Sequence, residues 1–319
     1  MKLEYLNLLK CPHTSENLKL EIIEGSSENI ISGKLTSSKN TYPIVNGIPR
    51  FVKDEGYSSN FGWQWNRWAK IQYESENING SMEGHTKNMF NQITELNEKK
   101  LFDKKILDIG CGPGRFVEIS KNYGAELVVA LDYSSAIDAA KLNLDSNDKI
   151  FFIQGDALNL PFKDGVFDFA YSIGVLHHTP DPEKGVSEAH RVISDNAEFA
   201  ISVYSANSYY DFVMTQFWRK FFKFLWPIFG HWPPYLYSQI FGRMNHYIRK
   251  ISRLLSLPMR LMFPSVTLPD VRWSVLDTFD SVTPSFQSSH TLDEVYDWYS
   301  KIGFSSIRFA KWDNIIGKK

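Results

Sequence analysis

The sequence has few cysteines and no apolar leader. Its 319 residues include two cysteines, Cys11 and Cys111, which are too few for a disulfide framework and fit a reducing compartment. The first residues, Met-Lys-Leu-Glu-Tyr, lack the apolar core of a secretory signal, so secretion is not indicated and we expect a cytoplasmic protein. No internal repeat is found, so a repeat architecture is not indicated.

The charge of the chain is nearly balanced, with 35 Lys and Arg against 36 Asp and Glu. One segment departs from this balance, because residues 212–269 contain no acidic residue. With 43% apolar residues, the chain is long enough for one large α/β domain with appendages and a sizeable core.

A glycine-rich turn follows an apolar run at residues 106–116, Ile-Leu-Asp-Ile-Gly-Cys-Gly-Pro-Gly-Arg-Phe. The pattern predicts a buried strand, a tight turn and then a helix, with glycines that let the backbone approach a ligand. Gly110, Gly112 and Gly114 stand at alternate positions, so the third glycine comes one residue too early for a dinucleotide site. The motif Asp108-x-Gly-x-Gly-x-Gly instead resembles the class I S-adenosylmethionine-dependent methyltransferases.

Three later segments repeat this resemblance in the same order along the chain. Each is an apolar run with candidate ligands at its carboxyl end, where doubly wound sheets bind ligands. The resemblance implies that Asp132 receives the ribose hydroxyls, with Tyr133 beside the adenine. It implies that Asp156 and the amide of Ala157 receive the adenine edge, and that a segment after the fourth strand lies beneath the methionine part. The implied cofactor residues are Asp108, Gly110, Cys111, Gly112, Gly114, Asp132, Tyr133, Asp156, Ala157, Ser172 and Ile173.

Each motif also has a purely structural explanation. The glycines alone are compatible with a plain strand-to-helix turn. Asp132 alone is compatible with a helix N-cap, because Ser134 and Ser135 follow it. Four motifs at consistent spacing together favour a site for S-adenosylmethionine.

Strands and helices alternate between residues 101 and 204, which predicts a parallel sheet covered on both faces. The expected strands lie at 106–109, 127–131, 150–153, 167–172 and 197–203. We expect an α/β, Rossmann-like doubly wound, mostly parallel seven-stranded sheet, with a small β-rich N-terminal module and a helical insertion before the last strands.

The C-terminal residues, 276–319, are expected to complete this sheet. Thr291 and Glu294 form a capping-box pattern at the start of a helix, and Gly303 ends that helix. A strand over 304–310 follows, and the resemblance implies that the last strand of the sheet is antiparallel.

The N-terminal residues, 1–54, are predicted to form short strands around turns. Leu8-Leu-Lys-Cys-Pro and Tyr42-Pro-Ile-Val-Asn-Gly-Ile-Pro resemble the zinc-ribbon-like module that activates some tRNA and protein methyltransferases. The metal ligands are missing, because Cys11-Pro-His-Thr stands where that module carries Cys-Pro-x-Cys, and residues 36–39 lack a second cysteine pair. Tetrahedral zinc needs four ligands, so we expect a module without metal.

Residues 55–100 are polar and predicted to be helical, with the aromatic cluster Phe-Gly-Trp-Gln-Trp-Asn-Arg-Trp at 61–68. This cluster either packs as core or provides Phe61, Trp63 and Trp65 as a lid over the cofactor. The truncated N-terminal module, the Phe-Gly-x-Gln-Trp segment and Gly-Val-Leu-His-His-Thr-Pro resemble a methyltransferase subgroup often encoded among glycan and lipopolysaccharide synthesis enzymes. The resemblance covers nearly the whole chain except the insertion.

The insertion, residues 205–275, is basic and aromatic. Between Asp211 and Asp270 there are eight Lys or Arg and no acids, interleaved with Phe, Trp and Tyr. Amphipathic helices of this composition lie on anionic lipid, so residues 205–269 are a candidate for peripheral contact at the inner face of a membrane. A lid over the acceptor pocket is an overlapping alternative. Nucleic acid is a weaker one, because no RNA-binding motif is present.

A general base helps methyl transfer when the acceptor is a hydroxyl. His177 and His178 are the catalytic candidates, because they follow the fourth strand. Tyr204, Asp280 and His290 are candidates for contact with the acceptor.

We expect a methyltransferase that acts on oxygen of a small, glycan-type or lipid-linked acceptor. For methyl transfer the protein mainly has to bring a nucleophile to the sulfonium and to exclude water. A non-catalytic module that holds the cofactor or a partner enzyme is an alternative. An RNA methyltransferase and an NAD-dependent oxidoreductase are further ones. Pro113 and Arg115 inside the glycine loop argue against the oxidoreductase.

Overall fold

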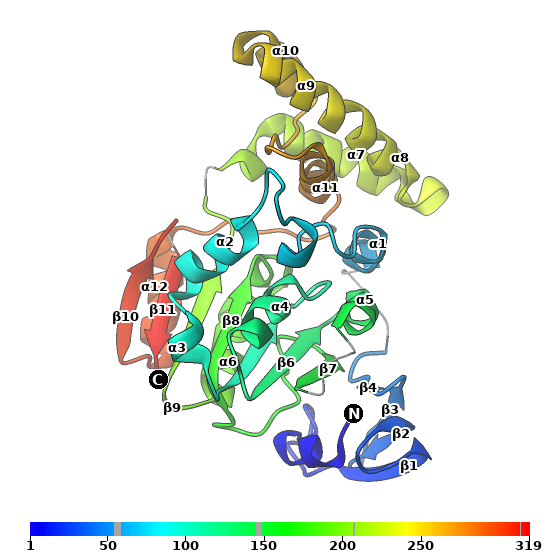
Figure 1. Cartoon of the computed structure of the whole chain (residues 1–319), viewed down its shortest axis with the longest axis vertical. Coiled ribbons are helices and arrows are strands. Elements are labelled where there is room, and N and C mark those ends of the chain that lie inside the picture. Colours follow the sequence, from blue (N-terminus) through cyan, green and yellow to red (C-terminus); the bar gives the residue numbers. More distant parts are fainter. Residues whose placement is uncertain (54–58, 145–148, 207, 313) are drawn as a thin grey trace.

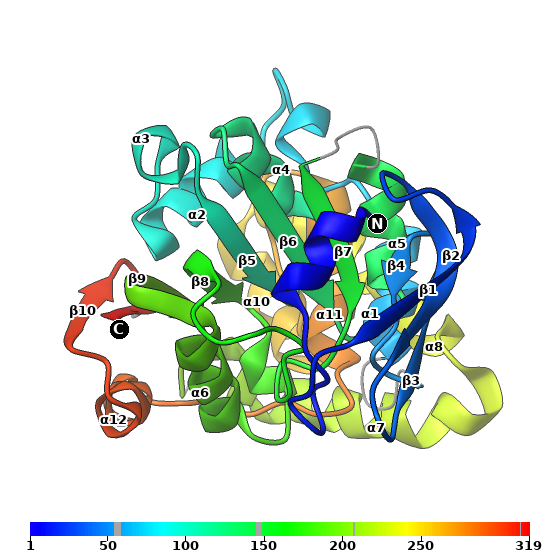
Figure 2. The ribbon, with the colours of Figure 1, turned by 90° about the horizontal axis from the view of Figure 1, so that it is seen from below.

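The computed structural model describes residues 1–53, 59–144, 149–206, 208–312 and 314–319 (Figure 1). A small sheet lies at one end of the molecule, a larger sheet with helices on both faces lies in the middle, and further helices project at the other end (Figures 1 and 2). The expected boundary between residues 54 and 55 lies outside the described residues.

The small sheet at the N-terminus is antiparallel. After the 3-10 helix η1 (Leu3–Leu8), its strands are β1 (Lys19–Gly25), β2 (Ile30–Thr36), β3 (Thr41–Val45) and β4 (Ile48–Pro49), paired in that order. Exposed and buried side chains alternate along β3, which is the pattern of a sheet with one packed face. Asn46 and Gly47 have φ values of 51° and 71° and form the tight turn between β3 and β4.

This sheet is joined to the larger one by hydrogen bonds. The Arg50 guanidinium donates to both carboxylate oxygens of Asp138, at 2.6 and 3.0 Å, and to Oε1 of Gln154, at 3.0 Å. The amide of Phe51 donates to the carbonyl of Gln154 at 2.8 Å. Side chains of both sheets also share one hydrophobic core.

Cys11 is buried in the N-terminal sheet and forms a hydrogen bond with the hydroxyl of Tyr42, with 3.2 Å between sulfur and oxygen. Within the described residues, no group of three or more His, Cys, Asp and Glu is placed to hold a metal ion.

The larger sheet has seven strands: β5 (Lys105–Ile109), β6 (Leu127–Asp132), β7 (Ile150–Gln154), β8 (Phe167–Ile173), β9 (Ile193–Ser202), β10 (Ser306–Ala310) and β11 (Asn314–Lys318). Their order across the sheet is β10-β11-β9-β8-β5-β6-β7. The strands from β5 to β9 pair in parallel, and β11 is antiparallel to both β9 and β10. The expected mostly parallel, seven-stranded sheet is confirmed.

Helices cover both faces of this sheet, because successive strand residues point to opposite sides. Ile106 and Val128 pack in one core cluster, and Leu107 and Val129 pack in another. The first cluster includes side chains from α2 (His85–Thr94), α4 (Arg115–Asn122) and α5 (Ala136–Leu144), and the second includes side chains from α6 (Pro182–Val192) and α12 (Leu292–Ile302).

The C-terminal helix has the predicted caps. The Thr291 hydroxyl accepts a hydrogen bond from the amide of Glu294 at 3.2 Å, and Gly303 follows the helix with φ 102°. The strand expected over 304–310 corresponds to β10, and β11 follows it.

The remaining helices connect the sheet strands or project from them. They are α1 (Ser59–Arg67), η3 (Glu74–Glu76), α3 (Glu98–Leu101), η4 (Leu176–His178), η5 (Tyr209–Asp211), α7 (Val213–Phe229), α8 (Trp232–Tyr237), η6 (Ser238–Gly242), α9 (Arg243–Ile251), α10 (Arg253–Met262) and α11 (Val271–Val282). Helices α7 to α10 lie at the end opposite the N-terminal sheet, and α11 lies between them and the seven-stranded sheet (Figure 1).

The expected end of the insertion, residue 275, lies within a helix. That position falls inside α11, which begins after Asp270, whose carboxylate accepts a hydrogen bond from the amide of Arg272 at 2.6 Å. The capped helix is continuous across the predicted boundary. None of the helices formed by the described residues combines the length and the apolar character needed to span a membrane.

Candidate functional site

The glycine turn between β5 and α4 forms one wall of a pocket. Gly110, Gly112 and Gly114 have φ values of 84°, 54° and 99°, a conformation that L side chains rarely adopt. A Cβ on Gly110 would also lie 2.3 Å from Cγ1 of Val175. Residues with a Cβ are therefore disfavoured at all three positions by the backbone conformation, and at Gly110 by packing as well.

Asp132 ends β6 and holds this turn. Its Oδ2 accepts a hydrogen bond from the amide of Gly112 at 2.9 Å, and its Oδ1 accepts from the amide and hydroxyl of Ser134 at 2.8 and 2.7 Å. The carboxylate also lines the pocket. Because an ionised carboxylate has about four acceptor positions, both the capping role and a ligand role are compatible with this geometry.

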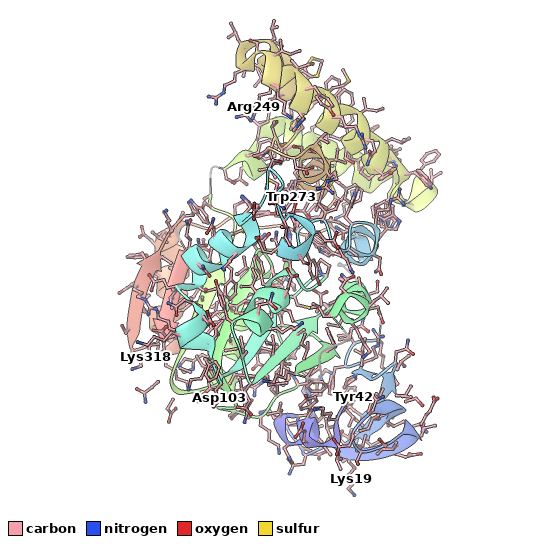
Figure 3. All side chains as sticks on the ribbon, viewed as in Figure 1. Lys19, Tyr42, Asp103, Arg249, Trp273 and Lys318 are labelled. Atoms are coloured by element: carbon pink, nitrogen blue, oxygen red, sulfur yellow. The ribbon has the colours of Figure 1, made fainter. Side chains whose placement is uncertain are left out.

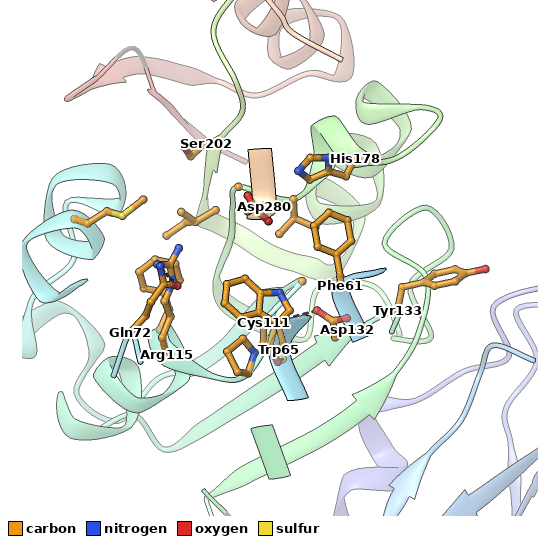
Figure 4. Close-up of a pocket in the computed structure, with 18 of the residues that line it drawn as sticks. Phe61, Trp65, Gln72, Cys111, Arg115, Asp132, Tyr133, His178, Ser202 and Asp280 are labelled. Carbon is orange, nitrogen blue, oxygen red and sulfur yellow. Dashed lines mark hydrogen bonds between the residues drawn. The ribbon is translucent and has the colours of Figure 1, made fainter. Parts of the chain in front are cut away.

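The pocket has a volume of about 350 Å³ and lies at the carboxyl ends of β5, β6 and β8 (Figure 4). This is where doubly wound sheets bind ligands, and the volume is typical of small-molecule sites. Besides these strand ends, α1, α2, η4 and α11 contribute side chains to its walls. Segments far apart in the sequence thus enclose one cavity.

Many of the predicted site residues line this pocket. They are Gly110, Cys111, Gly112, Asp132, Tyr133, Ala157 and Ile173 of the predicted cofactor residues, and His178 of the predicted catalytic pair. Five others do not line it: Asp108, Gly114, Asp156, Ser172 and His177. For these five a direct contact with a ligand stays a prediction.

Two of these five residues are acids, of which Asp156 bonds to its own loop and Asp108 lies inside a strand. The Asp156 carboxylate accepts hydrogen bonds from the amide of Leu158 at 2.9 Å and from Nδ2 of Asn159 at 3.1 Å. Asp108 is buried in β5, and burial raises the pKa of its carboxyl well above the ordinary value. A short polar side chain that can bond to its own turn often does so, which explains the position of Asp156.

The aromatic cluster divides between pocket and core. Phe61 and Trp65 line the pocket, and a Cβ on Gly112 would lie 3.4 Å from Nε1 of Trp65. Trp63 instead stacks on Phe279 of α11, with ring centroids 5.2 Å apart. Two of the three candidate lid residues therefore face the pocket, and the third packs α1 against α11.

The adjacent histidines have different surroundings. His177 is fully buried, its Nδ1 accepts from the amide of Tyr204 at 3.3 Å, and burial lowers its pKa well below the ordinary value. In His178, Nδ1 lies 3.0 Å from the carbonyl oxygen of Phe286, and since a carbonyl only accepts, we assign the proton to Nδ1. Burial lowers the pKa of His178 to about 4, although the charge of Asp280 opposes this shift. His178 thus presents an unprotonated Nε2.

The polar residues of the pocket that were not predicted as site residues include Arg115, Gln72 and Asp277. Arg115 donates to Oε1 of Gln72 at 2.7 Å and lies 4.4 Å from the centroid of the Phe116 ring. Nε2 of Gln72 donates to Oδ1 of Asp277 at 3.5 Å. Burial, helped by the charge of Asp280 and opposed by Arg115, raises the pKa of Asp277 to about 7. The position of Arg115 directly after the glycine turn was a usable signal, whereas Gln72 is remote from any motif.

Asp280 lies one turn after Asp277 on α11. It accepts hydrogen bonds from Nε2 of Gln64 at 2.9 Å and from the hydroxyl of Tyr204 at 3.2 Å, and both Asp280 and Tyr204 line the pocket. The third predicted acceptor contact, His290, does not line it and has Nε2 at 2.7 Å from the Ser288 hydroxyl. Asp280 lies beside His178 (Figure 4), and the Tyr204 and His178 ring centroids are 5.5 Å apart.

Comparison with known proteins finds similarity in the part of the chain that contains the pocket strands. Residues 107–201 match the family model described as "Methyltransferase domain". The norajmaline N-methyltransferase of Rauvolfia serpentina is 35% identical over 106 residues, which are 32% of this chain and 36% of that protein. The demethylmenaquinone methyltransferase of Staphylococcus haemolyticus is 32% identical over 130 residues, 40% of this chain and 53% of that protein.

Among solved structures, an S-adenosylmethionine-dependent methyltransferase from Mesorhizobium loti aligns with a TM-score of 0.33 and 25% identity, over 40% of this chain and 54% of that chain. The chain spans about a third to a half of the length of the curated relatives named here. The names of other relatives include a sterol 24-C-methyltransferase and a tocopherol O-methyltransferase, so relatedness does not fix the methylated atom.

Proposed function

Because residues 107–201 match the family model of a methyltransferase domain, we propose that the whole chain transfers a methyl group from S-adenosylmethionine to an oxygen atom of a small, glycan-type or lipid-linked acceptor. The observation that carries the proposal is the juxtaposition in one pocket of the glycine turn with Asp132 and of His178 with Asp280 and Tyr204. The cofactor supplies a methyl group activated on a sulfonium.

The residues present fit this cofactor. The turn at Gly110 and Gly112 exposes backbone that a Cβ would cover, and Trp65 lies over it. Asp132 would hold the ribose hydroxyls, with Tyr133 and Ala157 on the adenine side. Arg115, which lines the pocket at the start of α4, carries the positive charge that a carboxylate of the ligand requires.

His178 is the proposed general base for the acceptor hydroxyl. Its Nδ1 proton is committed to the Phe286 carbonyl, so its Nε2 is the free basic position. The neighbouring Asp280 favours the imidazolium that forms when the proton arrives. The Tyr204 hydroxyl is bonded to Asp280, and the pair would orient the acceptor. Phe61 and Trp65 exclude water from the reacting groups.

Within the proposed acceptors, the arrangement of α11 favours one carried on a lipid. This helix lines the pocket with Asp277 and Asp280, and it packs against α7, α8 and α9 on its other sides. The polar head of an acceptor would contact the polar groups of the pocket, and an apolar tail would contact the apolar surface close by. A glycan joined to a lipid has both a polar head and an apolar tail.

The test is calorimetry with S-adenosylhomocysteine, with NAD and NADP titrated separately, followed by a methyl-transfer screen that starts with glycans and lipid-linked sugars. Micromolar binding of S-adenosylhomocysteine alone is the expected result. Binding of a nicotinamide cofactor instead would overturn the proposal. Binding without transfer to any hydroxyl acceptor, but with transfer to amines or to RNA, would overturn the oxygen acceptor and retain the methyltransferase.

A variant separates catalysis from binding. His178→Asn removes the proposed base and keeps a polar side chain of smaller size. We expect unchanged affinity for S-adenosylhomocysteine and a loss of about 10²- to 10⁴-fold in kcat with a hydroxyl acceptor. His177→Asn is the matched control, because His177 does not line the pocket. An equal loss of kcat in both variants would argue for a structural role of the pair.

A further inference from the structure

Helices α7 to α10 expose large apolar side chains. More than half of the large apolar side chains that are exposed on the described residues lie between Val213 and Met262, in about a sixth of the chain. Five of them follow one another on α7 at spacings of four, four, three and four residues, which places them on one face of a helix. These are Val213, Phe217, Phe221, Phe224 and Ile228, and Phe224 and Ile228 are 77% and 75% exposed.

A second apolar stripe runs along α8, η6 and α9. Its members recur every three or four residues and are each at least 41% exposed: Trp232, Leu236, Ile240, Met244, Tyr247 and Ile251. The opposite side of these helices is buried against α11, where Nδ1 of His246 lies 3.1 Å from the Ser274 hydroxyl. On α7 the buried side likewise faces α11, since Arg219 donates to the carbonyl of Ser281 at 2.9 Å. Both stripes therefore lie on the sides of their helices that α11 leaves uncovered.

Positive charge accompanies the two stripes. Residues 212–269 contain eight Lys and Arg and no acid, although the whole chain has a net charge of −1. Lys220 and Lys223 flank the α7 stripe, and Arg243 and Lys250 flank the second one, and all four are exposed. Figure 3 shows Arg249 at the same outer end of the molecule, far from the N-terminal sheet.

We propose that the two stripes and their flanking cations, the apolar platform, bind the surface of an anionic lipid bilayer. Soluble monomers rarely expose contiguous apolar patches of this extent. Helices with an apolar face and a Lys- and Arg-rich border lie in the interfacial plane, with the apolar face about 5–10 Å deep. The anionic headgroups offer the charge that complements the cations.

Other occupants fit the platform less well. A second copy of the chain would place its own flanking cations against these, and like charges across an interface are unfavourable. A nucleic acid would meet the cations but would offer no hydrocarbon for Ile228 or Ile251. A lipid bilayer satisfies both the charge and the apolar side chains.

Binding in this way would set the acceptor pocket close to the membrane. Helix α11 lies between the platform and the pocket, with Trp273 on its pocket side (Figures 1 and 3). This orientation suits a lipid-linked acceptor and rests on the proposed function. The binding itself does not depend on methyl transfer.

The test is flotation of the purified full chain with vesicles of phosphatidylcholine alone or with about a third of phosphatidylglycerol. We expect binding to the anionic vesicles that weakens at high salt, since exposed charges are screened. Ile251→Ser removes a platform side chain that is 80% exposed, and we expect about tenfold weaker partitioning. Lys220→Gln with Lys250→Gln should cost about fivefold for each cation removed.

The matched control is Leu142→Ser on α5, because Leu142 is 84% exposed but lies outside the platform. It should partition like the unchanged chain. The platform is refuted if anionic vesicles do not bind the folded protein, or if Ile251→Ser and Leu142→Ser weaken binding equally. If the protein does not bind vesicles, and light scattering shows a dimer that Ile251→Ser dissociates, the apolar platform would instead be the interface with a second copy of the chain. Binding of S-adenosylhomocysteine, measured on the same samples, reports on the proposed function separately.

Discussion

Replacing Asp132 with Ala perturbs the cofactor side of the pocket in two ways. The carboxylate accepts from the amide of Gly112 and from the amide and hydroxyl of Ser134, so its loss frees a buried amide in the glycine turn. A hydrogen bond to a charged group contributes about 1.5–3 kcal/mol. The substitution also removes the proposed acceptor of the ribose hydroxyls.

We expect the dissociation constant for S-adenosylhomocysteine to rise about 10- to 100-fold in Asp132→Ala, which corresponds to about 1.4–2.7 kcal/mol. The free energy of unfolding without ligand should fall by about 1–3 kcal/mol, because Gly112 loses its partner. Calorimetric titration gives the first quantity and urea unfolding gives the second.

Two further variants separate these effects. Asp132→Asn keeps the size of the side chain but turns an amide donor toward the Gly112 amide or the ribose, so we expect a loss of affinity similar to that of Asp132→Ala. Ser134→Ala keeps the carboxylate and removes one of its donors, so affinity should change less than about threefold. An affinity in Asp132→Ala equal to that of the unchanged, folded protein would refute the assignment of Asp132 to the cofactor.

Three more predictions concern the pocket walls. Since the pKa of His178 is lowered to about 4, its side chain stays unprotonated down to pH 6. The value of kcat/KM for a hydroxyl acceptor should therefore stay level from pH 8 to 6. A fall in kcat/KM centred near pH 6.5 would contradict the lowered pKa. The pKa of Asp277 is raised to about 7, so its contribution to stability is fully present below about pH 4 and is lost as the pH rises through 7. Asp277→Asn should therefore raise the free energy of unfolding at pH 8 by about 1–3 kcal/mol and change it less at pH 5, as urea titrations at both values would measure. Gly110→Ala brings a Cβ to 2.3 Å from Cγ1 of Val175 and should lower the free energy of unfolding, measured in urea, by at least about 2 kcal/mol. The double variant with Val175→Ala should recover only part of this loss, because the Cβ of residue 175 still lies 2.8 Å away and the strain of positive φ remains. Full recovery would refute this reasoning.

The sequence was sufficient where local chemistry determines structure. The parallel strands contain apolar runs, which are longest in β6 and β7, as expected for strands buried on both faces, and their observed bounds differ from the predicted ones by a few residues. The glycine turn and the caps at Thr291 and Gly303 follow from backbone preferences that depend on single residues. These features need no knowledge of distant contacts.

The parts that the sequence did not determine depend on long-range packing. Gln72 and Asp277 meet across 205 positions of the chain, and no motif marks Gln72. His177 and His178 are neighbours in a 3-10 turn, and only tertiary contacts decide which of the two lines the pocket. The carboxylate of Asp156 could serve a ligand or its own turn, and the sequence pattern is the same in both cases.

The way Arg50 and Phe51 attach to Gln154 has a consequence for how the sheet avoids misassembly. Strand β7 is the last strand on its side of the seven-stranded sheet, and an uncovered edge strand offers its backbone groups to other chains. The residues after β4 occupy part of that edge through the backbone bond between Phe51 and Gln154, and Arg50 fastens them with three hydrogen bonds. The N-terminal sheet thus acts as an edge protector, and a chain shortened to its cofactor-binding part should aggregate through β7.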